Sequence, residues 1–349
     1  MPKPKERDTV SELLRLVSSS RNTGLYQKQI EQKLKISKSY CSEVVTRLER
    51  EEKLIRQKEP GKGNRIYSPQ FYPGHVAGLI RVGLLKSSEY VPIMAHLLEY
   101  FETEDSRVVF RFYNGTFDLL RDFRDGSLDF CLAPTPASIL SSVMRGDMVI
   151  LTGVASGGSG VIEQDMAEQD SILSTEVSSM IALSLKSKLP GEYPEIEPYD
   201  DPRSGIKKFV ESKYSMLAIW EPYFSAVLEN KRFRKAATYD DVLDGFPCCS
   251  LSASHELLRR QQHRIGQMID QYRSFELEEL HKKKTFSTAR AHVARATKYT
   301  KEFVEQTLNS YNFKNTTITR DMLSMLGVSI SQRQSDEIFF SGTFIQNRE

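Results

Sequence analysis

The stretch SKSYCSEVVTRLEREE, residues 37–52, predicts an amphipathic helix with one apolar and one polar face. Ser37 suits the N-cap position, because its hydroxyl can accept a hydrogen bond from an unpaired amide of the first turn. The apolar side chains recur at helical spacing and are Cys41, Val44, Val45 and Leu48. The opposite face carries side chains that can hydrogen-bond or contact phosphate: Lys38, Ser39, Tyr40, Ser42, Glu43, Thr46 and Arg47. The helix is therefore expected to pack on a core and to present a polar face to a partner.

The flanking residues predict two helices before this one and a hairpin after it. Residues 9–19 and 26–34 both place apolar side chains at helical spacing. Residues 54–58 and 65–68 are short runs suited to strands. Between them, residues 59–64 contain two glycines, one proline and one lysine, a composition typical of a turn. The predicted order is therefore three helices followed by a hairpin.

This order resembles the winged helix-turn-helix family of DNA-binding domains. The matching residues are Ser37-Lys38-Ser39, Leu48-Glu49 and Leu54-Ile55, which resemble a recognition helix leading into a wing. Lys53 departs from the family, because many members have a glycine there that ends the helix. A lysine at this place has to adopt a left-handed conformation or end the helix in another way. A helical domain that only packs on its neighbour is the alternative, but it leaves the lysine-bearing hairpin tip unexplained.

The resemblance implies that duplex DNA contacts the polar helix face and the hairpin tip. The candidate DNA-binding residues are Lys38, Ser39, Tyr40, Ser42, Thr46, Arg47, Lys62 and Arg65. Lys62 is expected to contact a phosphate, which positions the protein without reading sequence. Tyr40, Ser42 and Thr46 are the candidates for contacts with base edges. Because one such domain reads few base pairs, we expect a homodimer.

Charge is distributed unevenly along the 349 residues. The first 72 residues hold 16 Lys and Arg against 9 Asp and Glu, whereas the whole chain holds 48 against 46. A basic N-terminal part on a mildly acidic remainder is expected where one end meets phosphate.

The length is too great for one typical core and predicts two or three folding units. We place the DNA-binding unit at residues 1–75, because Pro73-Gly74 breaks the chain there.

The composition predicts where the protein is located and which kinds of chemistry it lacks. There is no apolar run of about 18 residues and no signal-peptide core, so a cytoplasmic location without membrane association is expected. The cysteines Cys41, Cys131, Cys248 and Cys249 show neither a disulfide framework nor zinc-ligand spacing. The adjacent pair Cys248-Cys249 is either redox-active or, as we expect, simply small and buried. None of the six histidines belongs to a catalytic motif, so no enzyme activity, metal or cofactor is expected.

From residue 76 onwards, predicted strands alternate with predicted helices. Strands are expected over residues 79–85, 107–112 and 128–133, each followed by a helix. Such alternation predicts an α/β fold with a parallel sheet and right-handed crossovers. The pattern repeats over residues 148–219, including a helix expected over 178–189, and residues 255–325 are mostly helical.

Four segments carry a second resemblance: FRDGSLDFCLAP at 123–134, SGGSGVI at 156–162, MLAIWEPY at 216–223 and CCSLSASHELL at 248–258. They resemble the type 2 periplasmic-binding-protein fold, particularly its nitrate, sulfonate, taurine and thiamine-pyrimidine precursor branch. The resemblance implies a two-lobed α/β domain over residues 76–330 and a tail over 331–349. Lobe 1 would comprise residues 76–154 and 250–330, and lobe 2 residues 155–249. Such a domain joined to a winged helix resembles the LysR plan of ligand-sensing regulators, although a long linker helix is lacking.

In such folds the ligand lies between the lobes, at strand ends and helix N-termini. Helix N-termini offer unpaired amides and partial positive charge, so the expected effector is a small anionic or strongly polar molecule. The candidate ligand-binding residues are Ser87, Ser88, Tyr90, Asn114, Gly115, Thr116, Thr135, Gly157, Gly158, Ser159, Thr175, Ser178, Ser179, Trp220 and Glu221. Trp220, the single tryptophan, either forms an aromatic wall or only packs in the core.

Together these features predict a DNA-binding transcriptional regulator whose winged helix responds to a small molecule bound between the lobes. The alternative is a cytoplasmic binding protein of the same fold with a helical interaction domain. An enzyme of that fold, for example in a pyrimidine or menaquinone precursor pathway, is the other form of this alternative. An enzyme would leave the basic N-terminal unit without a role.

Overall fold

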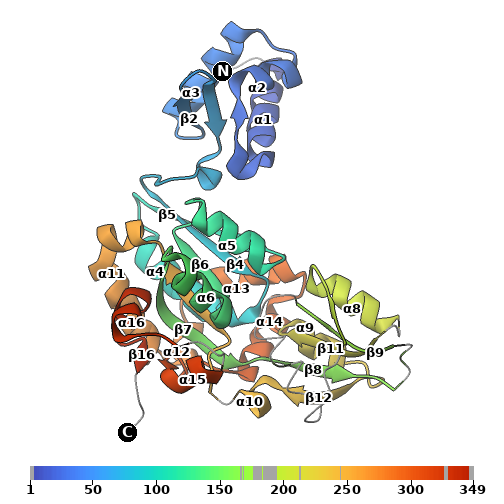
Figure 1. Cartoon of the computed structure of the whole chain (residues 1–349). Helices are drawn as coiled ribbons and strands as arrows, with labels where there is room; N and C mark the ends of the chain where they lie inside the picture. Colours follow the sequence, from blue (N-terminus) through green and yellow to red (C-terminus); the bar gives the residue numbers. More distant parts are fainter. Residues whose placement is uncertain are drawn as a thin grey trace.

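The computed structural model describes residues 4–165, 167, 169–175, 183, 195–211, 214–243, 245–325 and 329–345. Figure 1 shows a small N-terminal unit, in blue, at one end of a larger body with two lobes. Most of the helix expected over 178–189 lies outside the described residues. Among the helices that are described, none is both long enough and apolar enough to cross a membrane.

The N-terminal unit consists of helices and a small antiparallel sheet. Its elements are α1 (Pro4–Ser19), β1 (Leu25–Tyr26), α2 (Gln27–Leu34), α3 (Lys38–Arg50), β2 (Ile55–Glu59) and β3 (Gly63–Tyr67). The three strands pair in the order β1-β3-β2. The helices and the hairpin therefore form where the apolar spacing and the turn composition predicted them.

Helix α3 is held at both ends by local hydrogen bonds. The Ser37 hydroxyl accepts a hydrogen bond from the Tyr40 amide at 3.3 Å, as expected of an N-cap. At the other end Glu52 has a φ of 55°, and the Lys53 amide donates to the Leu48 carbonyl at 2.9 Å. This pattern is a Schellman motif, in which one residue adopts the left-handed conformation and the next amide reaches back. The left-handed residue is thus Glu52 rather than Lys53.

Lobe 1 is built on a six-stranded sheet with the order β14-β7-β13-β6-β4-β5. Its strands are β4 (Leu79–Leu85), β5 (Arg107–Tyr113), β6 (Phe130–Pro134), β7 (Val149–Gly157), β13 (Cys249–Ala253) and β14 (Tyr311–Asn312). The strands are connected by α4 (Val91–Phe101), α5 (Thr116–Arg124) and α6 (Thr135–Arg145). Strand β4 pairs in parallel with β5 and β6, but β13 is antiparallel to β6 and β7. The prediction of a parallel sheet therefore holds for β4, β5 and β6 but not for β13, which returns from lobe 2 and enters the sheet from the opposite end.

Lobe 2 is built on a five-stranded sheet with the order β10-β9-β11-β8-β12. Its elements are β8 (Ser159–Glu163), β9 (Gln169–Ser174), β10 (Glu195–Pro198), α8 (Pro202–Val210), β11 (Tyr214–Trp220), α9 (Tyr223–Leu228), β12 (Arg234–Thr238) and α10 (Tyr239–Val242). The chain passes from the first sheet to the second at Gly157-Gly158 and returns between β12 and β13. Gly158 has a φ of 65°, and a Cβ there would lie 1.8 Å from the Tyr311 ring. The crossing thus requires glycine.

The C-terminal part packs on lobe 1. It contains α11 (His255–Ser274), α12 (Leu277–His281), α13 (Lys284–Thr297), α14 (Lys301–Gln306), β15 (Ile318–Thr319), α15 (Arg320–Met325), α16 (Gln332–Ile338) and β16 (Phe344–Ile345). The prediction of a tail over 331–349 is wrong for residues 331–345. Ile338 and Phe339 are buried in a cluster with Ile150 and Ile318, and the Phe340 amide donates to the Ile150 carbonyl at 2.8 Å. These apolar side chains pack on strand β7 together with Ile139 of α6.

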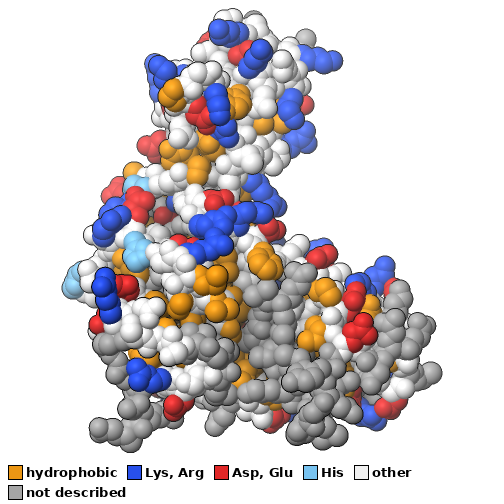
Figure 2. Space-filling model, in the orientation of Figure 1, with side chains coloured by type: hydrophobic (Ala, Val, Ile, Leu, Met, Phe, Trp, Pro, Cys, Tyr) orange, Lys and Arg blue, Asp and Glu red, His pale blue; other side chains and the backbone are white. Residues whose placement is uncertain are grey.

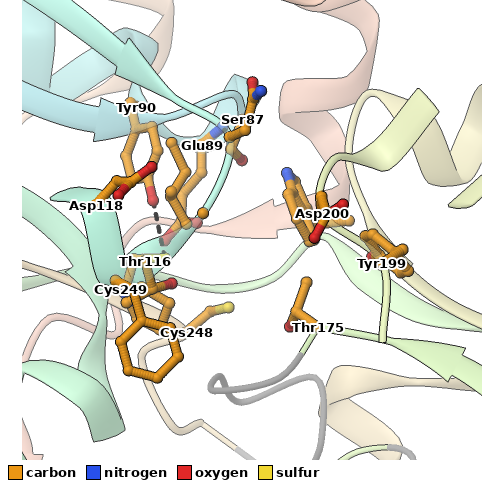
Figure 3. Close-up of a pocket in the computed structure, with 16 residues that line it drawn as sticks. Ser87, Glu89, Tyr90, Thr116, Asp118, Thr175, Tyr199, Asp200, Cys248 and Cys249 are labelled. Atoms are coloured by element: carbon orange, nitrogen blue, oxygen red, sulfur yellow. Dashed lines mark hydrogen bonds between the residues drawn. The ribbon is translucent and has the colours of Figure 1, made fainter. Parts of the chain in front are cut away.

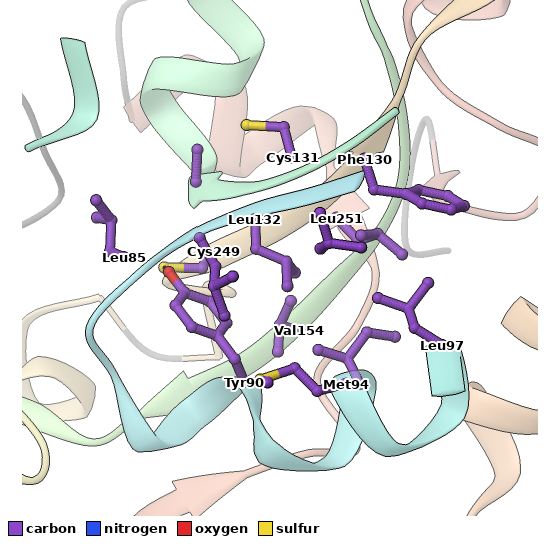
Figure 4. Packing of buried hydrophobic residues seen from close by; sticks show 14 of the residues in the cluster. Leu85, Tyr90, Met94, Leu97, Phe130, Cys131, Leu132, Val154, Cys249 and Leu251 are labelled. Carbon is purple, nitrogen blue, oxygen red and sulfur yellow. The ribbon is translucent and has the colours of Figure 1, made fainter. Parts of the chain in front are cut away.

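The main core lies between the sheet of lobe 1 and helix α4. Figure 4 shows Leu132 of β6 and Leu251 of β13 facing Met94 and Leu97 of α4. Tyr90 stands at the end of this cluster. The core therefore fixes the start of α4 and the strand ends beside it in one rigid arrangement.

One buried histidine on α4 makes stability depend on pH. His96 is 2% exposed, and its ring lies edge-on to Tyr272 and Phe275 at centroid distances of 5.6 and 5.4 Å. Burial lowers the pKa of His96 to about 4, and Glu99 and Lys283 nearby act in opposite directions. In the unfolded chain a histidine titrates near pH ~6.5. Between these values the unfolded state binds the extra proton, so stability falls as pH falls from about 6.5 to 4.

We expect this histidine to account for a loss of up to about 3 kcal/mol of unfolding free energy over that pH range. Urea unfolding at several pH values measures the effect. A His96→Leu variant should lose this part of the pH dependence, whereas His263→Leu should keep it, because His263 is exposed. Equal pH dependence in wild type and His96→Leu would contradict the assignment.

Candidate functional site

A cavity of about 370 Å³ opens between the two lobes, within the size range of small-molecule sites. Its lining residues come from both lobes: Leu85, Ser87, Glu89, Tyr90, Asn114, Gly115, Thr116, Phe117, Asp118, Pro134, Thr175, Tyr199, Asp200, Trp220, Cys248 and Cys249. Figure 3 shows Thr175, Tyr199 and Asp200 across the cavity from the residues of lobe 1. The cavity is therefore a cleft between the lobes.

The lobe 1 wall forms where parallel strands end. Leu85 ends β4, Pro134 ends β6, and Asn114 directly follows β5. Helix α5 begins at the cavity, with Gly115 at its N-cap. Ligands of open α/β sheets bind at the carboxyl ends of the strands, so the position of the cavity follows from the topology.

The lobe 2 wall is formed mainly by residues at the ends of β10 and β11. The Trp220 indole lies beside the Tyr199 ring at a centroid distance of 6.4 Å and donates to the Lys86 carbonyl of lobe 1 at 2.8 Å. The Ser88 amide donates to the Glu221 carbonyl at 3.2 Å. Trp220 therefore lines the cavity and also joins the lobes, so it does more than pack in the core.

The floor of the cavity is acidic and carries sulfur. Glu89 is 2% exposed, and its burial, with a smaller contribution from Cys248, raises the pKa of its carboxyl well above the ordinary value. Burial also raises the pKa of the Cys249 thiol. The Tyr90 hydroxyl donates a hydrogen bond to Cys249 Sγ at 3.1 Å. Burial therefore favours the protonated forms of these groups, which can donate hydrogen bonds to a ligand, and a cation can bind only by displacing their protons.

The charge of the walls disfavours the anionic effector expected from the helix N-termini. The cavity is lined by three carboxyl groups, Glu89, Asp118 and Asp200, and by no lysine or arginine among the described residues. Asp118 lies in the first turn of α5. Its charge offsets the partial positive charge of that helix end. A ligand with positive charge or hydrogen-bond donors fits these walls better.

The predicted ligand-binding residues divide into three groups. Those that line the cavity are Ser87, Tyr90, Asn114, Gly115, Thr116, Thr175 and Trp220. Those that are buried away from it are Ser88, Thr135, Gly157, Gly158, Ser159 and Glu221. Ser178 and Ser179 lie outside the described residues. The second group corrects the prediction, since these positions serve the fold rather than the cavity wall.

Two of these corrections have clear local causes. The Ser88 hydroxyl accepts a hydrogen bond from Thr307 at 2.9 Å, and the Glu221 carboxylate accepts from the Ser225 and Ser310 hydroxyls at 2.6 and 3.2 Å.

The lining residues that sequence reasoning missed are Leu85, Glu89, Phe117, Asp118, Pro134, Tyr199, Asp200, Cys248 and Cys249. Glu89 and Asp118 could have been found, because they adjoin predicted helix starts.

The N-terminal unit presents a second polar surface, part of which Figure 2 shows as blue Lys and Arg side chains. Among the predicted DNA-binding residues, the exposed ones are Lys38, Ser39 and Lys62, and the half-buried ones are Tyr40, Ser42, Thr46, Arg47 and Arg65. The Tyr40 ring packs against the core of the unit. The Thr46 hydroxyl donates to the Ser42 carbonyl at 2.7 Å and accepts from Arg56 at 2.8 Å.

Arg65 is not available as predicted. Its guanidinium contacts Glu59 at 2.6 Å and the Thr23 carbonyl at 2.8 Å, and it stacks over the Tyr26 ring at 4.5 Å. These contacts tie the hairpin to β1 and hold the charge within the unit. The prediction that Arg65 meets DNA is therefore corrected, and Lys62 remains as the exposed cation of the hairpin tip.

Polar contacts join the N-terminal unit to lobe 1. The Asn22 amide donates to Asp122 of α5 at 2.7 Å, and Asp122 also pairs with Arg111. The Arg111 guanidinium lies over the Phe71 ring at 4.4 Å. Helix α5 thus begins at the cavity and contacts the N-terminal unit near its other end.

The sequence matches no protein-family model and no curated protein. The structure is similar to a ligand-binding component of an ABC-type import system from Staphylococcus aureus with zinc bound (TM-score 0.56, 13% identity, 75% of this chain and 96% of that one). It is also similar to the alkanesulfonate-binding protein SsuA from Xanthomonas axonopodis bound to MOPS (0.55, 13%, 72% and 91%). A third similar structure is the nitrate-binding protein NrtA from Synechocystis (0.51, 12%, 71% and 75%). The two-lobed body therefore has the fold of periplasmic binding proteins.

Proposed function

We propose that this chain is a ligand-responsive DNA-binding transcriptional regulator. Residues 1–75 act as a winged helix-turn-helix domain, and the two-lobed domain acts as a sensor for a small molecule. In this proposal the protein is a cytoplasmic homodimer without enzyme activity. The single observation that carries the proposal is the structure of the N-terminal unit. Its helix α3 exposes Lys38 and Ser39, and the hairpin that follows in the chain exposes Lys62 at its tip.

The geometry of that unit supports DNA binding. Its elements follow the order helix, strand, helix, helix, hairpin, and β1 pairs with the hairpin to complete a three-stranded sheet. The apolar face of α3 is at most 1% exposed, which leaves the face with Lys38 and Ser39 for a partner. A helix of this kind enters the major groove, while a wing contacts the backbone. The local excess of basic residues supplies the electrostatic attraction.

The cleft supports the sensor role. Proteins with this fold that are described as binding an alkanesulfonate, nitrate or zinc show that it takes small ligands. In this chain the carboxyl groups of Asp118 and Asp200 favour a ligand that is cationic or rich in hydrogen-bond donors, whereas burial disfavours the ionised form of Glu89. The effector is thus a small polar molecule, and its charge is expected to differ from that of nitrate.

Helix α5 supplies a route from the cleft to the DNA-binding unit. Its first turn lines the cavity with Thr116, Phe117 and Asp118, and Asp122 contacts Asn22 of the N-terminal unit. A ligand that favours one position of this helix therefore biases the placement of that unit. The ligand can act only to the extent that its affinity differs between the two arrangements.

We test the proposal with charge-removing variants of the N-terminal surface. Lys38→Ala and Lys62→Ala should each weaken binding to duplex DNA by about tenfold, or about 1.4 kcal/mol per dimer. Fluorescence anisotropy at low salt measures this loss. Lys207→Ala is the matched control, because its exposed lysine lies on lobe 2. Equal affinities for all four proteins would contradict DNA binding by this surface.

A further inference from the structure

Three potential metal ligands meet at the floor of the cleft. Glu89 lies in the turn before α4, Cys248 precedes β13, and Cys249 begins that strand. One ligand atom from each of the three lies within 4.8 Å of the other two. Figure 3 shows Cys248 with its sulfur toward the open centre of the cavity. The fold thus brings together a carboxyl and two thiols that are far apart in the sequence.

The burial of these groups is an independent observation. Glu89, Cys248 and Cys249 are 2%, 7% and 5% exposed. Within the described part of the chain, Glu89 Oε1 has no hydrogen-bond partner. A buried polar atom without a partner costs about 1–3 kcal/mol, and a cation bound by this carboxyl group would remove that cost.

The donor atoms select the class of that occupant. Thiolate ligands favour soft or borderline ions such as Zn²⁺, whereas Mg²⁺ and Ca²⁺ prefer oxygen alone. Zn²⁺ commonly takes four ligands, and sites that bind a further molecule have three from the protein and one open position. Tyr90 adds an outer contact, because its hydroxyl donates to Cys249 Sγ at 3.1 Å. Such contacts orient and tune ligands of a metal.

We propose that Glu89, Cys248 and Cys249 bind one thiophilic divalent cation of the zinc class, with its fourth position open to the cleft. The ion is then either the effector itself or the group of the site to which the effector binds. That regulatory role rests on the proposed function, but the binding of the ion does not. Two of the three ligands are the adjacent cysteines for which the sequence offered only redox activity or burial.

The test uses the full-length chain, freed of metal by a chelator. Zn²⁺ is titrated against a competing indicator dye, and Co²⁺ is used as a spectroscopic probe of thiolate ligation. We expect one ion per chain and a sulfur-to-cobalt charge-transfer absorption. Glu89→Gln should weaken Zn²⁺ binding at least about 10–100-fold, the range known for outer-shell changes. The double variant Cys248→Ser/Cys249→Ser should lose the absorption band.

Cys131→Ser is the matched control, because Cys131 is a buried thiol of β6 that does not line the cavity. It should bind Zn²⁺ like the wild type. Urea unfolding and circular dichroism identify any variant that fails to fold, and Glu89→Gln keeps the shape of the side chain. A wild-type protein with no bound Zn²⁺, a Co²⁺ spectrum without thiolate bands, or unchanged binding in Glu89→Gln would overturn the three-ligand site.

DNA binding, measured on the same samples, separates the two proposals. Zn²⁺ binding by a chain that binds no DNA would leave the metal site standing and remove the regulator. DNA binding by a chain that binds no Zn²⁺ would remove the metal site and leave the regulator.

Discussion

Replacing Asp122 with alanine should lower the free energy of unfolding by about 3–5 kcal/mol, because it leaves the charge of Arg111 buried without its partner. Arg111 is 9% exposed and Asp122 is 2% exposed. Asp122 also accepts a hydrogen bond from the Tyr113 hydroxyl at 2.7 Å and one from Asn22 at 2.7 Å. The change therefore removes two contacts within lobe 1, with Arg111 and Tyr113, and one contact with the N-terminal unit. Urea unfolding measures the loss.

The control for this change is an exposed ion pair three residues further along the chain. Arg124 and Asp125 lie 3.3 Å apart with side chains 42% and 41% exposed. Such pairs contribute about 0–1 kcal/mol, so Asp125→Ala should change the free energy of unfolding very little. A loss below about 1 kcal/mol for Asp122→Ala would show that Arg111 finds other partners or water, contrary to the described packing.

Raising the salt concentration should weaken DNA binding steeply. If Lys38, Arg47 and Lys62 each meet a phosphate in both protomers, about six contacts release counterions, and the logarithmic slope is about −5. Affinity should then fall about 10³-fold between roughly 50 and 200 mM salt. Anisotropy titrations at several salt concentrations measure this slope.

The same titrations on Lys38→Ala assign part of the slope to one residue. The variant should have a slope smaller by about 2, because a dimer loses two phosphate contacts. Lys207→Ala of lobe 2 should keep the wild-type slope. A slope near zero for the wild type would mean that any DNA binding is not carried by the charged surface of the N-terminal unit.

Much of the fold could be predicted because strong local patterns specify it. Helix α3 and strand β4 are marked by apolar spacing, and both form where expected. Strand β12 was missed because two of the five residues of its sequence RKAAT are charged and its residues are mostly exposed at a sheet edge. The antiparallel course of β13 could not be read either. The direction of β13 depends on the return of the chain from lobe 2, which is a feature of the tertiary structure and leaves no local pattern in the sequence.

The site shows the same division between local and tertiary information. Ser87 and Asn114 line the cavity because residues after parallel strands meet at one edge of the sheet, and this rule can be applied to a sequence. The meeting of Glu89 with Cys248 cannot be predicted from spacing, because it requires the register of β13 beside β6. Arg65 was misassigned since its partner Glu59 reaches it only across the hairpin.

The most direct test of the central claim is selection of genomic DNA fragments by the full-length protein at low salt, followed by footprinting. The account predicts enrichment of a defined sequence with two protected half-sites spaced by about one helical turn, ~10 base pairs, or a multiple of it. The protection should be lost in the Lys38→Ala/Lys62→Ala double variant. Absence of any enriched fragment, or protection that persists unchanged in the double variant, would contradict the account.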